Sequence, residues 1–179
     1  MRTVADASRT PPRGTAKDRA LRLLGVRWRS REELRRRLRQ AGFEAEEIAD
    51  ALDDLERAGL VEDERFAREL VRDQATRRLA GNRVIRNALR EKGVAPEIVD
   101  AVLEETGEEA DRALTLASRR GARMQVLDPD AAYRRLHSLL RRRGFSYAVA
   151  SEAAKAALRA SGWDADDGSA GGPQRVRPG

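Results

Sequence analysis

A glycine recurs every 51 residues along this chain, at Gly42, Gly93 and Gly144. Apolar residues and one arginine repeat around it at the same spacing. One fixed offset that pairs apolar with apolar, Gly with Gly and Arg with Arg is typical of tandem structural repeats. The matched positions are Leu34, Ile85 and Leu136; Leu38, Leu89 and Leu140; Arg39, Arg90 and Arg141; Ile48, Val99 and Ala150; and Leu52, Leu103 and Ala154.

The first copy reads as two helices joined by a turn. Ser30 is a predicted N-cap, and Glu33 completes a capping box because its carboxylate can reach back to the Ser30 N–H. Gly42 can adopt the left-handed conformation that ends a helix. A shorter helix over about 17–28 precedes this pair, with Ala20, Leu21 and Leu24 on one side. The expected buried residues of the pair are Leu34, Leu38 and Ala41, then Ile48, Ala51, Leu52 and Leu55.

The later copies keep the helical period with different turn residues. Asp63 is a candidate N-cap, Gly81 is expected to break the helix before it, and Pro96 fits the first turn of another helix. A turn at residues 128–130 precedes a further helix. The expected buried residues are Phe66, Ala67, Leu70, Val71, Ala75, Ile85, Ala88, Leu89, Ile98, Val99, Val102 and Leu103 in the second copy, and Ala110, Leu114, Ala117, Gly121, Tyr133, Leu136, Leu139, Leu140, Ala150, Ala153, Ala154, Ala157 and Leu158 in the third.

These patterns predict an all-α fold of about nine helices. Three short helices bury little surface alone, so each group must pack on its neighbour. We therefore expect a tandem array of three three-helix repeats that forms an elongated, curved rod. The predicted repeats span 17–60, 61–106 and 107–161. Polar residues 1–16 and the Gly-, Asp- and Pro-rich residues 162–179 are predicted to be disordered tails.

The composition excludes several classes of protein. Charged residues make up 37% of the 179-residue chain and aromatic residues only 4%, which favours a slim helical protein with a thin aliphatic core. The absence of cysteine excludes disulfides and thiolate chemistry and argues against a zinc knuckle. No apolar run approaches the ~20 residues of a membrane span, and no secretory signal is recognisable. We expect a cytoplasmic protein without membrane contact.

Catalytic chemistry has little support in the sequence. The one histidine, His137, flanks predicted core leucines and is better explained as a partly buried spacer than as a base. No Gly-rich phosphate loop with Gly-Lys-Ser/Thr occurs. The carboxylate pairs Glu32–Glu33, Glu46–Glu47 and Asp53–Asp54 lie near helix ends or on outer faces. We expect no enzymatic activity, no cofactor and no metal.

The basic residues are more informative about function. The net charge is +6, which makes polyanions or acidic protein surfaces plausible partners, although a GC-rich genome would also favour arginine. When the apolar stripes face inward, one arginine recurs in the last turn of each repeat's middle helix, where it could simply complement the helix dipole. The alternative is a basic ridge that binds carboxylate or phosphate. The candidate contact residues are Arg35, Arg36, Arg39, Arg83, Arg86, Arg90, Arg134, Arg141 and Arg142.

Several segments together resemble the RecX family of bacterial recombination regulators. They are LRRRLRQAG at 34–42, LERAGL at 55–60, VEDERFA at 61–67, Gly81, and IRNALREKGV at 85–94. In that family an acidic-x-x-Phe-Ala segment opens the middle unit and a Lys-Gly pair ends its second helix. The resemblance covers about residues 20–158 and is looser in the third repeat. Glu62 stands where the family usually has Asp.

The resemblance implies a concrete function. RecX-like proteins are all-helical rods of three repeats that bind RecA and lodge in the groove of the RecA–DNA filament. There they suppress ATPase, strand exchange and coprotease activity by capping or destabilising the filament. We accordingly expect RecA protein and the RecA–DNA filament as partners of a monomer, with direct contact to the DNA backbone left open. The alternatives are an autonomous nucleic-acid-binding helical protein and a generic helical adaptor.

Overall fold

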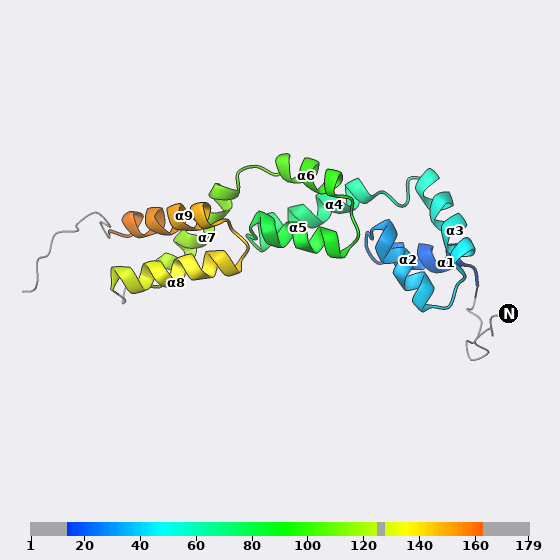
Figure 1. The fold of residues 1–179 in the computed structure, drawn as a ribbon, viewed down its shortest axis with the longest axis horizontal. Coiled ribbons are helices and arrows are strands. Elements are labelled where there is room, and N and C mark those ends of the chain that lie inside the picture. The colour runs from blue at the N-terminus through cyan, green and yellow to red at the C-terminus, as the bar shows by residue number, and fades with distance from the viewer. Residues whose placement is uncertain (1–13, 125–127, 163–179) are drawn as a thin grey trace, which may run out of the picture. The chain divides into compact units, whose positions relative to one another are not determined.

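The computed structural model describes residues 14–124 and 128–162, and in these ranges all regular structure is helical (Figure 1). The predicted all-α class is confirmed. Most of each predicted tail lies outside the described residues. The inner end of the first tail is described, and Thr15 there caps the first helix. The elements are α1 (Ala16–Leu24), α2 (Arg31–Gln40), α3 (Ala45–Arg57), α4 (Asp63–Arg72), the π-helical turn η1 (Asp73–Arg77), α5 (Asn82–Glu91), α6 (Pro96–Glu104), α7 (Glu109–Gly121), α8 (Pro129–Arg142) and α9 (Tyr147–Ala160).

The chain divides into two compact units. Unit 1 comprises residues 1–78 and 85–107, and unit 2 comprises residues 79–84 and 108–179. Helix α5 therefore begins in unit 2 and continues in unit 1. The helices are consistent with three sets of three. The predicted curved rod depends on how one unit is placed against the other, and it stays a prediction.

Helices α1, α2 and α3 enclose a small aliphatic core. The leucines of α2 and the stripe of α3 are buried as predicted. Two expectations for α1 are wrong: it ends at Leu24, and Leu21 is 40% exposed. Ala20 is buried as predicted, and the buried side of α1 also carries Ala16, because these small side chains let α1 lie close to α3.

The N-cap assignments were only partly right. Ser30 caps α2 by accepting from the Glu33 N–H, but the Glu33 side chain does not reach back to Ser30. The complete capping box belongs to Thr15 and Asp18 at the start of α1, and that hydrogen bond from Thr15 lowers the pKa of Asp18. Asp63 is the first residue of α4 rather than its N-cap, a position that Glu62 occupies.

The segment after α4 differs from the prediction at Gly81. The helix continues through η1, and the chain then turns at Leu79, whose φ of 47° is left-handed. A non-glycine residue pays roughly 1–2 kcal/mol for that conformation. Leu79 is 9% exposed and packs in the core of unit 2, which offsets the strain. Gly81 does not end the helix. Because it has no side chain, it allows two backbone segments to approach each other closely.

Unit 2 is a three-helix bundle in which both α7 and α8 pack on α9. The alanine-rich stripe of α9 is buried as predicted, and Phe145 is fully buried. The predicted stripe of α7 is wrong in its first half. Ala113 and Leu116 are buried, whereas Ala110 is exposed and Leu114 is 41% exposed.

Consecutive repeats are connected by similar sets of hydrogen bonds at two places in the chain. In unit 1, Ser30 Oγ donates to the Lys92 carbonyl at 2.5 Å, and the Arg31 N–H donates to Asp63 Oδ1 at 2.7 Å. Gly93, with φ +74°, lies so close that a Cβ there would overlap the Glu32 side chain. We call this arrangement the repeat joint.

The second repeat joint lies within unit 2. The Gly81 N–H donates to the Arg143 carbonyl at 2.9 Å, and the Asn82 N–H donates to Glu109 Oε1 at 2.7 Å. Gly81 and Arg143 each stand 51 residues after their counterparts Ser30 and Lys92. Gly144, with φ +93°, again approaches the neighbouring repeat, where a Cβ would lie 2.7 Å from the Val84 nitrogen. Both joints satisfy helix-end polar groups that would otherwise lack partners.

Candidate partner-binding surface

Four of the nine candidate arginines contribute to structure within their own unit. Arg36 donates to the Glu91 carbonyl at 2.6 Å, and Arg83 donates to the Arg141 carbonyl at 2.9 Å, so both close a repeat joint at a helix C-terminus. Arg35 pairs with Glu32 at 2.7 Å and Arg86 with Asp100 at 2.9 Å. Paired side chains of this kind have less charge to offer a partner.

The recurrent last-turn arginines do not behave alike. All three occupy the last turn of α2, α5 or α8. Arg141 donates to the Phe145 carbonyl, in the turn between α8 and α9, at 2.9 Å and lies 6.0 Å from the Tyr147 ring centroid, so it has structural partners within its own unit. Arg39 and Arg90 are exposed. A single binding ridge through these three positions stays a prediction.

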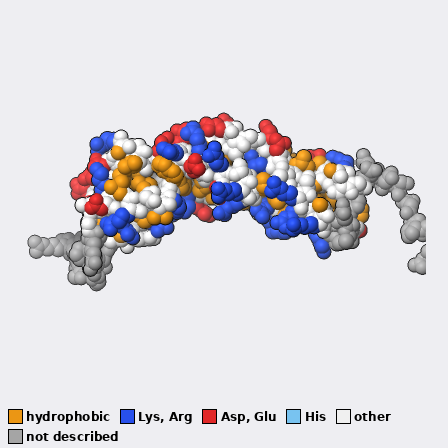
Figure 2. All heavy atoms as spheres, turned by 180° about the vertical axis from the view of Figure 1, so that it is seen from behind, with side chains coloured by type: hydrophobic (Ala, Val, Ile, Leu, Met, Phe, Trp, Pro, Cys, Tyr) orange, Lys and Arg blue, Asp and Glu red, His pale blue; other side chains and the backbone are white. Residues whose placement is uncertain are grey.

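The remaining candidates converge on α8. Arg134 and Arg142 line an open groove of about 630 Å³, together with Arg135, Ser138 and Met124. Within the described ranges, no ion pair engages the three arginines. Figure 2 shows blue side chains gathered along the lower edge of unit 2, on the right of the view. We call these three arginines the α8 cluster.

Sequence reasoning missed Arg135. The signal was available, because position 135 shares a helix face with 138 and 142 at i, i+3 and i+7. The offset of 51 that relates Arg141 to Arg39 and Arg90 aligns Arg135 with Val84 and Glu33, and neither of these is a cation. Periodicity within α8 itself is the better guide to this cluster.

Glu33 is the most perturbed carboxylate of unit 1. Its side chain is only 6% exposed, and burial alone would raise its pKa. The hydrogen bond from Arg27 at 2.5 Å and the charges of Lys92, 3.3 Å away, and of Arg27 outweigh burial and lower the pKa to about 2. Arg29, itself 7% exposed, also pairs with Glu33. Glu33 therefore balances a cluster of cations next to the first repeat joint.

Three of the other carboxylates predicted near helix ends or on outer faces, Glu47, Asp53 and Asp54, have structural partners. Glu47 accepts from the Ala16 N–H at 2.9 Å. Asp53 pairs with Arg31 at 2.5 Å, and the hydrogen bond from Lys17 lowers the pKa of Asp54. Burial raises the pKa of Asp63, although the hydrogen bond from Arg31 opposes that effect. These acids hold helices together and do not converge on a cleft.

His137 belongs to an aromatic cluster that the sequence did not suggest. Its ring stacks on Tyr133 with centroids 5.7 Å apart and meets Tyr147 edge-on at 4.9 Å. The Tyr133 hydroxyl in turn donates to Ser151 Oγ at 3.3 Å. The partly buried spacer role predicted for His137 agrees with these contacts. Trp28, by contrast, is covered by Arg65, whose guanidinium lies 4.1 Å from its ring.

The described part of the chain was searched for metal-binding groups of side chains and for membrane-spanning helices. No group of three or more His, Cys, Asp or Glu side chains there could hold a metal ion. A search of the same residues finds no helix with the length and apolar character needed to span a bilayer.

The fold and its surface define an all-helical repeat protein whose candidate contacts are arginines. Two family models match the chain: "RecX, first three-helix domain" over residues 16–55 and "RecX, second three-helix domain" over residues 63–103. The regulatory protein RecX of Corynebacterium efficiens is 40% identical over 147 residues, covering 78% of this chain and 70% of that protein. The regulatory protein RecX of Mycolicibacterium vanbaalenii is 36% identical and covers 86% and 89%.

A solved structure shares the fold. The crystal structure of RecX from Lactobacillus salivarius has a TM-score of 0.71 at 23% identity and covers 77% of this chain and 91% of that one. The chain belongs to the RecX family of regulatory proteins. The resemblance noted from residues 34–42, 55–67 and 85–94 is thereby confirmed.

Proposed function

We propose that this chain binds RecA and its filament on DNA and inhibits ATPase, strand exchange and coprotease activity by capping or destabilising the filament. Membership of the RecX family is the observation that carries this proposal. We further propose that the protein is not an enzyme and acts in the cytoplasm as a monomer. The exposed arginines supply a surface for acidic protein or phosphate.

Adding the protein to preformed RecA filaments is expected to lower single-strand-DNA-stimulated ATP hydrolysis at substoichiometric ratios. A protein that caps or breaks a filament acts on many protomers at once, so few molecules should be needed. The measurement is an ATPase titration at two salt concentrations. An unchanged rate of ATP hydrolysis at excess protein would contradict the proposal.

The α8 cluster is proposed to contact the phosphate backbone. Arg134 and Arg142 come from the original candidate set, and three cations without a carboxylate partner among the described residues suit phosphate better than paired arginines do. The second candidate function, an autonomous nucleic-acid-binding protein, also rests on this cluster. Tight binding to naked DNA with a steep salt dependence would favour it. Weak DNA affinity beside strong filament affinity would favour the RecA proposal.

Changing Arg134, Arg135 and Arg142 together to glutamine is expected to weaken filament binding by roughly tenfold or more at low salt, and to reduce the salt slope by about one for each lost phosphate contact. The matched control changes Arg57, Arg72 and Arg77 to glutamine, because these side chains are 75%, 76% and 83% exposed and pair only within α3, α4 or η1. Equal losses in both variants would mean that net charge matters and the α8 cluster does not.

A further inference from the structure

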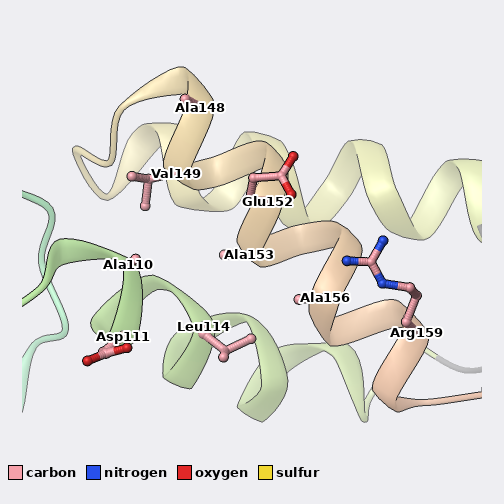
Figure 3. A pocket seen from close by; sticks show the side chains of 9 residues that line it. All are labelled: Ala110, Asp111, Leu114, Ala148, Val149, Glu152, Ala153, Ala156 and Arg159. Carbon is pink, nitrogen blue, oxygen red and sulfur yellow. The ribbon is translucent and has the colours of Figure 1, made fainter.

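An open apolar groove of about 380 Å³ runs along α7 and α9 (Figure 3). Ala110 and Leu114 line it from α7, and Val149, Ala153 and Ala156 line it from α9. Leu114 is 41% exposed, which is unusual for a leucine beside a bundle core. The close-up shows the Leu114 side chain reaching into the space between the two helices.

Both helices carry a wider apolar arc than their core requires. On α9, Ala150, Ala154 and Ala157 are buried, and Ala153, which is 5% exposed, belongs to the core and also lines the groove. Val149 and Ala156 on α9 are half-buried and line the groove. On α7, Ala113 and Leu116 face the core while 110 and 114 face the groove. A helix that needs one buried face shows one apolar stripe. The apolar residues beyond that stripe face one groove on both helices, which indicates a surface suited to docking.

The charges around the groove are arranged by sign. Asp111 in the first turn of α7 lines one part, and Arg159 lines the part beside the last turn of α9 (Figure 3). Glu152 also lines the groove, but its carboxylate pairs with Lys155 at 3.4 Å. The carboxylate of Asp111 would repel a polyanion at its part of the groove. A protein segment with a cation near Asp111 and an acid near Arg159 would be complementary.

We propose that this groove docks an amphipathic helix of the RecA protomer, an inference that rests on the proposed function. A groove between two helices accepts a third helix through apolar side chains at i, i+3 or i+4, and i+7. The alanines at 153 and 156 allow its backbone to approach closely. A second copy of this chain fits less well, because its large exposed hydrophobics outside the groove, in the described ranges, are isolated and form no helical row: Leu21, Val26, Leu60 and Tyr147.

The test measures binding of the full chain to RecA filaments on single-stranded DNA. Leu114→Gln and, separately, Ala110→Gln are expected to weaken binding at least tenfold with an unchanged salt slope, because they place a polar side chain in the apolar groove without changing any charge. Leu21→Gln is the matched control, since Leu21 is 40% exposed and lies on α1. It should bind within twofold of the unmodified chain, and circular dichroism should show equal helicity for all variants.

The outcomes separate this inference from the proposed function. If the unmodified chain does not bind filaments, the proposed function fails. If it binds and both groove variants bind equally well, the docking inference alone is overturned. A photocrosslinker at position 156 should attach to a RecA helix that has apolar residues at i and i+4 and a basic residue within one turn. Crosslinks to DNA, to an extended RecA segment, or to a second copy of this chain would also overturn it.

Discussion

Changing Glu33 to glutamine is expected to lower the free energy of unfolding of unit 1 by about 3 kcal/mol at neutral pH. The glutamine keeps the shape of the side chain but removes the negative charge with which Arg27, Arg29, Arg37 and Lys92 pair. Arg29 is 7% exposed and cannot regain water without opening the fold. Urea unfolding followed by circular dichroism measures the loss.

The same carboxylate predicts how stability depends on pH. Its pKa in the folded protein is about 2, below the ordinary glutamate pKa of 4.5, so the folded state favours the ionised form. The stabilisation is fully present above pH 4.5 and is lost as the pH falls towards 2. Two and a half pKa units correspond to about 3 kcal/mol. The Glu33→Gln variant should lack this part of the acid sensitivity.

Glu32→Gln is the matched control for Glu33. Glu32 is adjacent and pairs with Arg35, but its side chain is 30% exposed, so its loss should cost less than about 1 kcal/mol. Asp63, whose pKa is raised by burial, contributes with the opposite sign. Its contribution is common to all three proteins and cancels in the comparison. Equal stability of the Glu32→Gln and Glu33→Gln variants would show that the cation cluster needs no buried counter-charge.

Changing Gly81 to alanine is expected to destabilise unit 2 by about 3 kcal/mol, the upper end of the range for overpacking. A Cβ at this position would overlap the backbone of Gly144 and Phe145. Backbone atoms cannot move aside as a flexible side chain can. The expected consequence is a loosened repeat joint with loss of the Gly81–Arg143 and Asn82–Glu109 hydrogen bonds. Thermal unfolding and amide hydrogen exchange in α5 and α8 measure it.

Gly59→Ala separates crowding from backbone conformation. Gly59 has φ +68° and no atom within 4 Å of the position of a Cβ, so alanine there costs only the left-handed strain, about 1 kcal/mol. Gly144→Ala combines both penalties, because its φ is +93° and its Cβ would meet Val84. The expected order of destabilisation is Gly59 below Gly81 and Gly81 below Gly144. A Gly81→Ala protein as stable as the Gly59→Ala protein would contradict the joint as described.

The candidate site was predictable only in part. The period of 3.6 residues shows that Arg36, Arg83 and Arg134 point away from the core. It does not show that Arg36 and Arg83 reach carbonyls 55 and 58 residues along the chain, whereas Arg134 joins the groove on α8. Exposure follows from local periodicity, but the availability of a charge depends on which other helix ends lie within reach.

Glu33 and Leu114 also show that local periodicity does not predict which groups from other helices a side chain contacts. An acid three residues after Ser30 has the pattern of a capping box, but its partners are Arg27, Arg29 and Lys92, and Lys92 comes from the next repeat. On α7, apolar residues at 110, 113, 114, 116 and 117 satisfy two alternative helical stripes. Packing against α9 selects the stripe through Ala113 and Leu116 and leaves Leu114 in the groove.

The sequence alone determined the all-helical class, most helix ends, the aliphatic core positions and the family, because these depend on local period, turn residues and matched spacing. The tertiary structure alone decided the repeat joints, the counter-charge role of Glu33 and the apolar groove. Each of these joins residues from different helices, and no periodicity within one helix encodes the distance between two.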